Sequence, residues 1–476
     1  MPAALEVKSN VEVAAGSTLT FQNQDAILTF DHPDAHNLLT INGTVAVGFD
    51  TTATPTINPT GGLMGVYSYY GDLHIGTTGQ FSLTSSATLP AFGFYNVSGT
   101  EVVFINDGRF EVTGANVQGM RASTQIHFEN NGTFRVSGAH VVGAEGSYSI
   151  FENTGHFEAS GGPSPVGVSL YGIRQAFDNS GDLRAVSNGA GFGTAVIWQA
   201  QDSSFTNSGL IEGDTALVVR PPSSSPSFQT QLFTNTGTIH GAMTFNWNMD
   251  LLDNSRGTIV GDVDLGAGAD TYSAAAGVMH GALHGGAGDD VIMAGGGSNY
   301  LRGDDGVDRI VGGSDFDDIN GNAGDDTASG GLGDDWVVGG KDNDSLSGGA
   351  GGDVVWGNLG NDTQEGGDGD DQVRGGQGDD SVSGGAGNDY VSGDRGADTI
   401  SGGTGADLFH GSQDAGIDRV LDFNSAEGDR VFLDPGTTYT LSQVGADTVI
   451  DMGGGHQMIL VGIQLSTLTA GWIFGA

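Results

Sequence analysis

The stretch from Gly285 to His410 begins GGAGDDVIM AGGGSNYLR GDDGVDRIV and ends GGAGNDYVS GDRGADTIS GGTGADLFH. It divides without a gap into fourteen nonapeptides, and the sixth position is aspartate in all but the second, where it is Asn299. The thirteen aspartates are Asp290, Asp308, Asp317, Asp326, Asp335, Asp344, Asp353, Asp362, Asp371, Asp380, Asp389, Asp398 and Asp407. This pattern matches the calcium-binding nonapeptide G-G-x-G-x-D-x-U-x, in which U is apolar. We therefore expect these aspartates to be metal ligands.

Calcium chemistry accounts for the composition of the turns. The ion takes about six to eight oxygen ligands and accepts backbone carbonyls beside carboxylates, so one turn supplies half a site and the next turn the rest. Such turns need left-handed backbone, which glycine adopts freely and Asn or Asp tolerates. The second position is glycine except at Asp304, Asn322, Asn358 and Asp394. The sequence thus predicts several bound Ca²⁺ ions.

The eighth position predicts where the core lies. It is apolar in nearly every repeat, from Ile292 to Phe409, and Ala328 and Gln364 are the weak positions. A disordered Gly/Asp-rich tract would not keep an apolar residue at a fixed phase. Asp315 and Asp342 replace the fourth-position glycine, so we expect their turns to be distorted or to supply extra ligands.

From these repeats onward the chain resembles the RTX (repeats-in-toxin) proteins of Gram-negative bacteria. Residues 417–433, IDRVLDFNSAEGDRVFL, look like the strand pair that follows such repeats, and the tail from Ala446 to Ala476 is similar to the family's C-terminal ending. The resemblance implies a calcium-binding parallel β-roll, a small β cap carrying an uncleaved type I secretion signal, and the secretion apparatus as a partner. It implies no particular activity, because the same module follows proteases, lipases, epimerases, adhesins and surface-layer proteins.

Composition independently favours an extracellular, calcium-dependent protein. The chain has 15 Lys plus Arg against 58 Asp plus Glu, a net charge of -43, so it repels itself unless cations neutralise it and is a poor partner for nucleic acid. It has no cysteine, so no disulfide supports the fold. We find no N-terminal signal peptide pattern and no segment of about 20 apolar residues that would span a membrane. We expect secretion, with folding delayed until calcium is plentiful.

The first half of the chain contains a looser repeat, F-x-N-x-G followed by alternating apolar positions. Its asparagines lie 19 to 28 residues apart and are Asn106, Asn130, Asn153, Asn179, Asn207, Asn235 and Asn254. A period of this length with alternating apolar residues indicates a solenoid. We predict an all-β protein: a right-handed parallel β-helix over residues 1–262, the β-roll over 263–410 and the cap over 411–476. Phe should stack on Phe inside, and Asn on Asn in a hydrogen-bonded ladder.

Charges alternate along one column of this predicted β-helix. Five residues after successive asparagines stand Glu111, Arg135, Glu158, Arg184, Glu212 and His240. Stacked strands lie about 4.8 Å apart, so opposite charges in register stabilise one another. We interpret the column as a structural ladder. The alternative is a saccharide-binding or catalytic strip of the kind that polysaccharide lyases use.

No catalytic motif supports an enzyme. HExxH and GxSxG are both missing, which argues against a metalloprotease of the kind that often precedes such repeats and against the usual lipase. Mannuronan epimerases combine a β-helix with RTX repeats, but their catalytic cluster has no matching motif here. The nearest candidate is FDHPDAH, with Asp31, His32, Asp34 and His36, for which a solvated turn is the simpler interpretation. We predict a protein that is not an enzyme.

Outward-facing positions of the β-roll suggest a contact surface. Two nonapeptides make one turn of a β-roll, so odd and even repeats lie on opposite sheets. The even repeats carry the interface candidates Tyr300, Trp336, Val338, Val354, Trp356 and Tyr390. An aromatic patch on a hydrophilic surface usually marks a contact, here with another subunit, a cell-surface glycan or lipopolysaccharide, or a covering part of the same chain.

Together these features predict a secreted structural protein at the cell surface or in the extracellular matrix of a Gram-negative bacterium. We expect it to self-assemble into sheets or filaments, as a surface layer, a biofilm matrix or an adhesive fibre. Two alternatives remain open: a polysaccharide-modifying enzyme of the uronate lyase or C5-epimerase type, and a monomeric glycan-binding adhesin.

Overall fold

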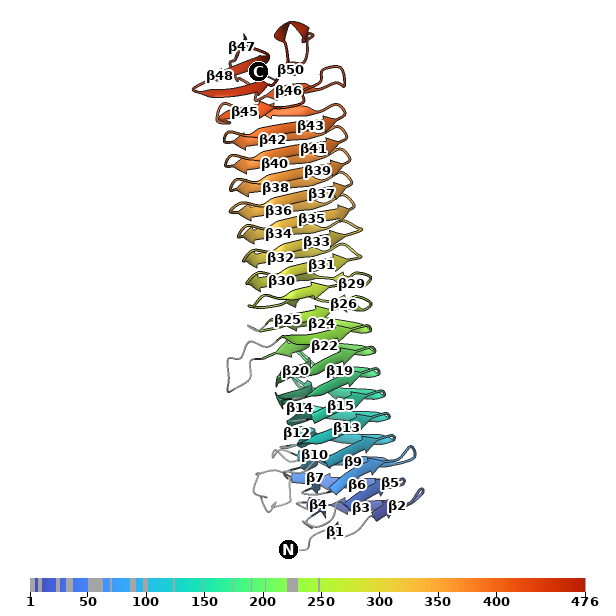
Figure 1. The fold of residues 1–476 in the computed structure, drawn as a ribbon. Helices are drawn as coiled ribbons and strands as arrows, with labels where there is room; N and C mark the ends of the chain where they lie inside the picture. Colours follow the sequence, from blue (N-terminus) through green and yellow to red (C-terminus); the bar gives the residue numbers. More distant parts are fainter. Residues whose placement is uncertain are drawn as a thin grey trace. The chain divides into compact units, whose positions relative to one another are not determined.

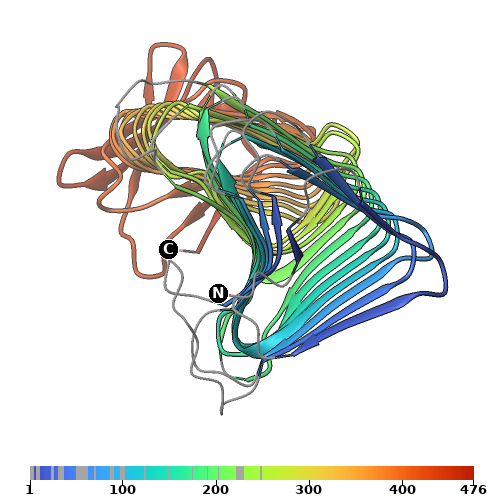
Figure 2. The same cartoon turned by 90° about the horizontal axis from the view of Figure 1, so that it is seen from below.

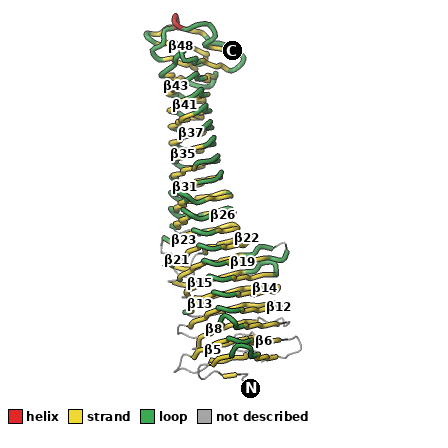
Figure 3. The backbone as a smooth tube through the Cα atoms, turned by 90° about the vertical axis from the view of Figure 1, so that its right-hand side faces the viewer, coloured by secondary structure: helices red, strands yellow, loops and turns green. Residues whose placement is uncertain are grey.

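The computed structural model describes residues 5–6, 11–22, 26–30, 37–49, 63–68, 71–85, 91–96, 102–122, 125–147, 149–173, 175–189, 191–201, 203–220, 230–246 and 249–475. The chain forms two compact units, Met1–Asp262 and Val263–Ala476. Both units are built mainly from β-strands stacked in parallel (Figure 1), and the described residues contain a single helical turn, η1 (Leu465–Thr467). Figure 3 separates these strands, in yellow, from the loops and turns that connect them, in green. No helix in this part of the chain is long or apolar enough for a membrane span.

The first unit is a parallel β-helix whose coils have three faces. The asparagine face consists of β2 (Val11–Val13), β5 (Asn37–Ile41), β8 (Gly71–Ile75), β11 (Val102–Asn106), β13 (Ile126–Asn130), β15 (Ser149–Asn153), β18 (Ala176–Asn179), β21 (Ser204–Asn207), β23 (Gln231–Asn235) and β25 (Asp250–Asp253). Four strands each contribute to both of the other faces; they are β12 (Arg109–Ala122), β14 (Thr133–Ser147), β22 (Leu210–Val219) and β24 (Thr238–Thr244).

The other two faces complete each coil. The ladder face consists of the first parts of these four strands with β3 (Thr18–Gln22), β6 (Thr44–Phe49), β9 (Gln80–Ser85), β16 (His156–Ser160), β19 (Asp182–Val186) and β26 (Thr258–Val260). The third face consists of their second parts with β1 (Leu5–Glu6), β4 (Ala26–Phe30), β7 (Leu63–Ser68), β10 (Ala91–Asn96), β17 (Val166–Ile173) and β20 (Thr194–Gln201). Seen from below, strands of successive coils overlie one another (Figure 2).

Two kinds of stack hold the inside of the β-helix, as the sequence predicts. Phenylalanine rings lie face to face in columns, for example Phe104 on Phe128 with centroids 5.2 Å apart and Phe134 on Phe157 at 4.6 Å. The repeat asparagines are at most 1% exposed, and each side-chain amide donates to the Oδ1 of the next at 2.7 or 2.8 Å, from Asn106 to Asn254. Buried amides in register satisfy one another, which removes the desolvation cost that each would otherwise carry.

The charge column is a pairing ladder on the ladder face. Glu111, Arg135, Glu158, Arg184, Glu212 and His240 are direct register partners in that order. Arg135 lies 3.2 Å from Glu158 and 3.8 Å from Glu111, and Arg184 lies 3.0 Å from Glu212. Each arginine is thus engaged by a carboxylate on a neighbouring strand, as a structural ladder requires.

The second unit contains the β-roll. Its aromatic sheet consists of β27 (Val263–Asp264), β30 (Ala282–Ala287), β32 (Tyr300–Asp305), β34 (Asp318–Ala323), β36 (Trp336–Lys341), β38 (Val354–Leu359), β40 (Gln372–Gln377), β42 (Tyr390–Arg395), β44 (Leu408–Gly411) and β46 (Arg430–Leu433). Its hydroxyl sheet, rich in outward Ser and Thr, consists of β28 (Thr271–Ser273), β31 (Val291–Gly295), β33 (Arg309–Gly313), β35 (Thr327–Leu332), β37 (Ser345–Ala350), β39 (Thr363–Asp368), β41 (Ser381–Ala386), β43 (Thr399–Thr404) and β45 (Ile417–Val420). The short strand β29 (Val278–His280) precedes β30 in the chain.

Strand register confirms two nonapeptides per turn of the roll. From β30 to β42 each strand pairs with the strand 18 residues later, as Val337 does with Val355. The eighth-position side chains, Gln364 included, are at most 3% exposed. All four non-glycine residues at the second position have positive φ, from 65° at Asp394 to 78° at Asn358. Asp342 also adopts a φ of 75°, whereas Asp315 has negative φ and accepts the Gly297 N–H at 3.0 Å instead, so only the Asp315 turn departs from the common backbone.

The C-terminal part closes the roll with a small antiparallel group. Strands β47 (Thr440–Val444), β48 (Asp447–Gly453) and β49 (His456–Leu460) pair antiparallel, and β49 also extends the hydroxyl sheet beside β45. Strand β50 (Ile473–Phe474) continues the aromatic sheet beside β46. Strands β45 and β46 therefore extend opposite sheets.

Candidate metal centre and contact surface

The thirteen repeat aspartates lie inside the turns of the roll, in two columns. None is more than 3% exposed. In each of them Oδ1 accepts a backbone N–H at 2.7 to 3.0 Å from the residue that stands one turn of the roll earlier. One carboxylate oxygen therefore fixes the side chain to the preceding turn.

The second oxygen of every one of these aspartates is free to bind. Oδ2 is buried in all thirteen and has no hydrogen-bond partner among the described residues. The first-position glycine of each repeat gives it room, because a Cβ at Gly303 would overlap Asp308 Oδ2 and would lie 2.8 Å from the carbonyl oxygen of Gly321. The same overlap recurs at each first-position glycine from Gly285 to Gly402.

The second repeat shows what happens without the carboxylate. It is the repeat with Asn299 at the sixth position, and it also has Ala294 where the other repeats have their first glycine. The Asn299 amide donates to the Gly297 carbonyl at 2.7 Å and to Asp317 Oδ1 at 2.8 Å. Loss of the aspartate and loss of the glycine thus coincide, as expected if the glycine exists to leave space at Oδ2.

Burial makes these carboxylates costly to ionise without a cation. Desolvation, together with repulsion from neighbouring carboxylates, raises the pKa of Asp344 to about 8, that of Asp290 and Asp326 to about 7 and that of Asp308 to about 6. Unpaired carboxylate oxygens beside backbone carbonyls are the hard donors that Ca²⁺ prefers. The turns therefore fit calcium ions, whose charge would keep the aspartates ionised.

The structure extends these columns beyond the repeats that we identified in the sequence. Asp418 is 1% exposed, its Oδ1 accepts the Asp398 N–H at 3.3 Å, and burial with repulsion from Asp398 raises its pKa. At the other end the Asp270 N–H donates to Asp290 Oδ1 at 2.7 Å. Both residues stand 20 rather than 18 residues from the next aspartate, so they fall outside the nonapeptide register. For Asp270 the sequence does contain a signal, the segment GAGAD over residues 266–270, which resembles the start of a repeat.

The interface candidates all lie on the aromatic sheet, but not as one unbroken patch. The Trp336 and Trp356 rings meet edge to face with centroids 5.4 Å apart, and their strands place Trp336 beside Val354 and Val338 beside Trp356. Trp336 is 40% exposed and Tyr300 50%. Tyr300 is separated from Trp336 by Asp318, and Arg374 separates Trp356 from the next turn. The sequence did not reveal that Arg374 lies over the Tyr390 ring, 5.5 Å from its centroid.

A pocket of about 190 Å³ adjoins the tryptophan pair. It is lined by Trp356, Asn358, Arg374, Gly376 and Asp394. Trp356 Nε1 and Arg374 Nε are buried donors with no hydrogen-bond partner in the part of the chain that the structure describes. Two residues that line the pocket, Trp356 and Arg374, therefore each carry a buried donor that no described group satisfies. The FDHPDAH candidates Asp31, His32, Asp34 and His36 lie outside the described residues.

Comparison with known proteins identifies the repeats. A family model described as the RTX calcium-binding nonapeptide repeat (4 copies) matches residues 284–319, 302–337, 311–346, 329–364, 365–400 and 384–417. The chain thus contains RTX repeats, which bind calcium. No curated protein sequence matched the chain.

Among solved structures, extracellular lipase LipA from Serratia marcescens is similar at 18% identity and a TM-score of 0.17. The similarity covers 38% of this chain and 40% of the lipase. The chain thus spans less than half the length of that enzyme, and a similarity at this level carries no argument about activity.

Proposed function

We propose that this protein is a secreted, non-enzymatic, calcium-dependent structural protein that self-assembles at the cell surface or in the extracellular matrix. The observation that carries the proposal is the tryptophan pair on the aromatic sheet, in which Trp336 is exposed and Trp356 is half-buried beside it. Large aromatic side chains left exposed on a hydrophilic surface are typical of contact surfaces, and aromatic anchors supply much of the binding energy there.

Calcium supports the proposal in two ways. The buried aspartates require cations before the roll can fold with its carboxylates ionised, so the contact surface forms only where calcium is plentiful. The net charge of -43 would keep copies of the chain apart, and divalent ions reduce that repulsion. Both effects confine assembly to the outside of the cell, in keeping with type I secretion.

The test is assembly by the purified chain. We expect calcium added to protein held in chelator to produce folding by circular dichroism, then ordered sheets or filaments in electron micrographs. The double variant Trp336→Ser/Trp356→Ser should fold with calcium but remain monomeric. Leu332→Ser, which removes an even more exposed apolar side chain from the hydroxyl sheet, should assemble normally. A wild-type protein that folds to a stable monomer at high concentration would refute self-assembly.

A monomeric glycan-binding adhesin is the second candidate. The unused donors Trp356 Nε1 and Arg374 Nε, carried by residues that line the pocket of about 190 Å³, favour it, because sugar rings stack on aromatic faces while their hydroxyls accept hydrogen bonds. Binding on a glycan array that is lost in Arg374→Gln while assembly persists would assign glycan binding to this pocket. Equal binding by the variant and the wild type would exclude the pocket.

A further inference from the structure

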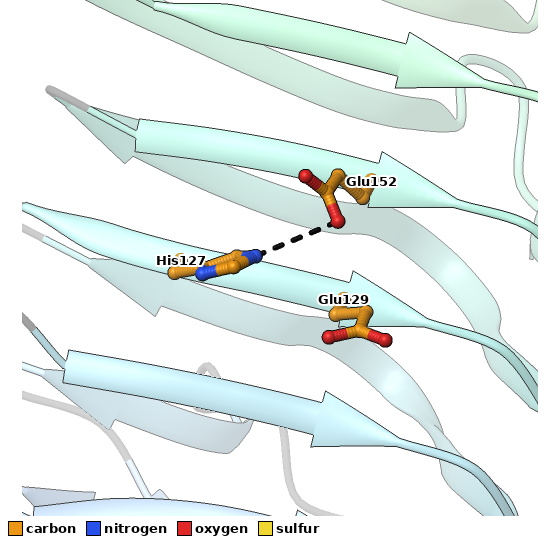
Figure 4. Close-up of side chains that lie close together, drawn as sticks. All are labelled: His127, Glu129 and Glu152. Atoms are coloured by element: carbon orange, nitrogen blue, oxygen red, sulfur yellow. Dashed lines mark ion pairs between the residues drawn. The ribbon is translucent and has the colours of Figure 1, made fainter.

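Three side chains with metal-binding atoms meet on the outer surface of the asparagine face, away from the calcium repeats. His127 and Glu129 lie two residues apart on β13, so they point to the same side, and Glu152 is the direct partner of Glu129 on β15. One donor atom from each residue lies within 4.8 Å of the others. His127 Nε2 is 3.6 Å from Glu152 Oε2, the ion pair drawn in Figure 4.

The charges in this column do not balance one another. In strand register the described stretch runs Ile105, Glu129, Glu152, Asp178 and Thr206, so three acidic residues follow one another without a basic residue between them. Like charges directly opposite on neighbouring strands destabilise a sheet. On the ladder face of the same coils an arginine separates the acidic residues at each step. The asparagine face therefore has an acidic column that a bound cation would stabilise.

The imidazole supplies a second and independent indication. His127 Nε2 is inaccessible to solvent and has no hydrogen-bond partner in the described structure. By contrast, His156 Nε2 lies 3.2 Å from Glu158 Oε2 within hydrogen-bonding geometry, and Arg135 engages the same carboxylate. The two faces thus offer the same residue types, but only His127 keeps an unused ring nitrogen beside two carboxylates.

We infer that His127, Glu129 and Glu152 bind a divalent transition-metal ion of the zinc type. One imidazole nitrogen and two carboxylate oxygens form a three-ligand set that leaves a coordination position open to water or to another molecule. Ligands about 2.0 to 2.2 Å from zinc lie roughly 3.4 Å apart in a tetrahedral site, close to the 3.6 Å between His127 and Glu152. Glu152 is 45% exposed in its side chain, so it can rotate to complete the site.

The donor set separates this site from the calcium turns. Ca²⁺ takes oxygen ligands, whereas imidazole nitrogen suits zinc, copper or nickel. The inference is independent of the assembly that we propose, since neither the tryptophan pair nor the roll takes part. Zinc binding should therefore persist when the calcium sites are saturated.

The experiment is a calorimetric titration of the folded full-length protein with Zn²⁺ in saturating Ca²⁺. We expect one site in the wild type, and an affinity at least about tenfold weaker in His127→Gln and in Glu152→Gln, because loss of a direct ligand costs at least as much as loss of a residue behind it. His156→Gln is the matched control, because it removes an imidazole beside a carboxylate from the other face, and it should bind zinc as the wild type does.

A second measurement keeps the result interpretable. Co²⁺ bound at the site should give a visible absorption band that His127→Gln removes, while circular dichroism confirms that each variant remains folded. Unchanged zinc affinity in both His127→Gln and Glu152→Gln would overturn the inference. So would zinc binding that disappears when calcium saturates the turns, because the ion would then occupy the repeats.

Discussion

The aspartates of the roll divide their two oxygens between structure and ligand binding. Oδ1 is held by a backbone N–H from the preceding turn, and Oδ2 faces the space that the first-position glycine leaves. A glycine is needed there because any Cβ would occupy the position of the carboxylate oxygen. The pairing of Ala294 with Asn299 is the natural example of both features lost together.

Gly303→Ala should weaken calcium binding at one site without preventing the rest of the roll from folding. The new Cβ would overlap Asp308 Oδ2, so either the carboxylate or the turn must move. We expect one ion fewer at saturation in a calcium titration followed by circular dichroism. Gly352→Ala is the control, since its Cβ would meet no atom closer than 3.3 Å. Identical calcium stoichiometry in the two variants would show that Oδ2 is not a ligand.

Asn153→Ala should destabilise the β-helix. Asn153 accepts from Asn130 at 2.7 Å and donates to Asn179 at 2.7 Å, so alanine removes a hydrogen bond from a buried amide on each side of it. We expect a loss of about 2 to 4 kcal/mol in the free energy of unfolding, measured with urea in the presence of calcium. Thr154→Ala, one residue along on the exposed corner, should cost far less. A similar loss in both would mean that the ladder contributes little.

In both units, interactions between the side chains of successive coils or turns hold neighbouring strands in register. In the β-helix, the amides of the ladder, the stacked phenylalanine rings and the alternating charges find their partners on neighbouring strands of the same chain. In the roll, the apolar eighth position forms a thin core, and the columns of carboxylates at the turns lack their own counter-charges. Roll strands therefore depend on cations far more than β-helix strands do.

The metal-free roll should become less stable as the pH rises. Burial raises the pKa of Asp344 to about 8 and of Asp335 and Asp380 to about 7, from an ordinary value of 3.8. A folded form with raised pKa values holds more protons than the unfolded chain, so its stability is greatest below the ordinary value and is lost as the pH rises through the folded values. In chelator, we expect a higher melting temperature at about pH 5.5 than at about pH 8.

Bound calcium should reverse the dependence of the roll's stability on pH. The ion binds ionised carboxylates, so calcium affinity should fall as the pH drops through about 8 to 6, the range of the raised pKa values. Calcium titrations at several pH values would measure it. A metal-free roll that is more stable in alkaline solution, or a calcium affinity independent of pH, would contradict the assignment of these aspartates as buried ligands.

Over the complete chain, the two units should respond differently to calcium removal. In the first unit the buried asparagine amides hydrogen-bond to one another, while the second unit has thirteen buried Oδ2 atoms without hydrogen-bond partners among the described residues. In chelator, limited proteolysis should therefore degrade the chain after about residue 262 and spare the part before it. Calcium should protect both parts. Equal degradation of the two units in chelator would contradict this difference.

The sequence alone determined the repeat architecture, because periodicity fixes which side chains share a column. It predicted the all-β fold, the inward eighth position, the asparagine and phenylalanine stacks and the charge ladder from Glu111 to His240, and the register confirms them. Stacked repeats contact only their neighbours, so spacing along the chain translates directly into neighbours in space.

Only the tertiary structure revealed the features that depart from the regular repeat spacing or that depend on distances between atoms on different strands. Asp418 and Asp270 join the calcium columns through 20-residue steps that the nonapeptide pattern does not contain. The interruption of the aromatic surface is different, because Asp318 and Arg374 stand in even repeats at the same outward positions as Tyr300 and Trp356, so the 18-residue register already places them there. Glu129 and Glu152 occupy the same position of the F-x-N-x-G repeat, so the sequence already pairs them. Only the structure shows that His127 Nε2 comes within 3.6 Å of Glu152 Oε2, because that approach depends on how the two side chains are oriented across the strands.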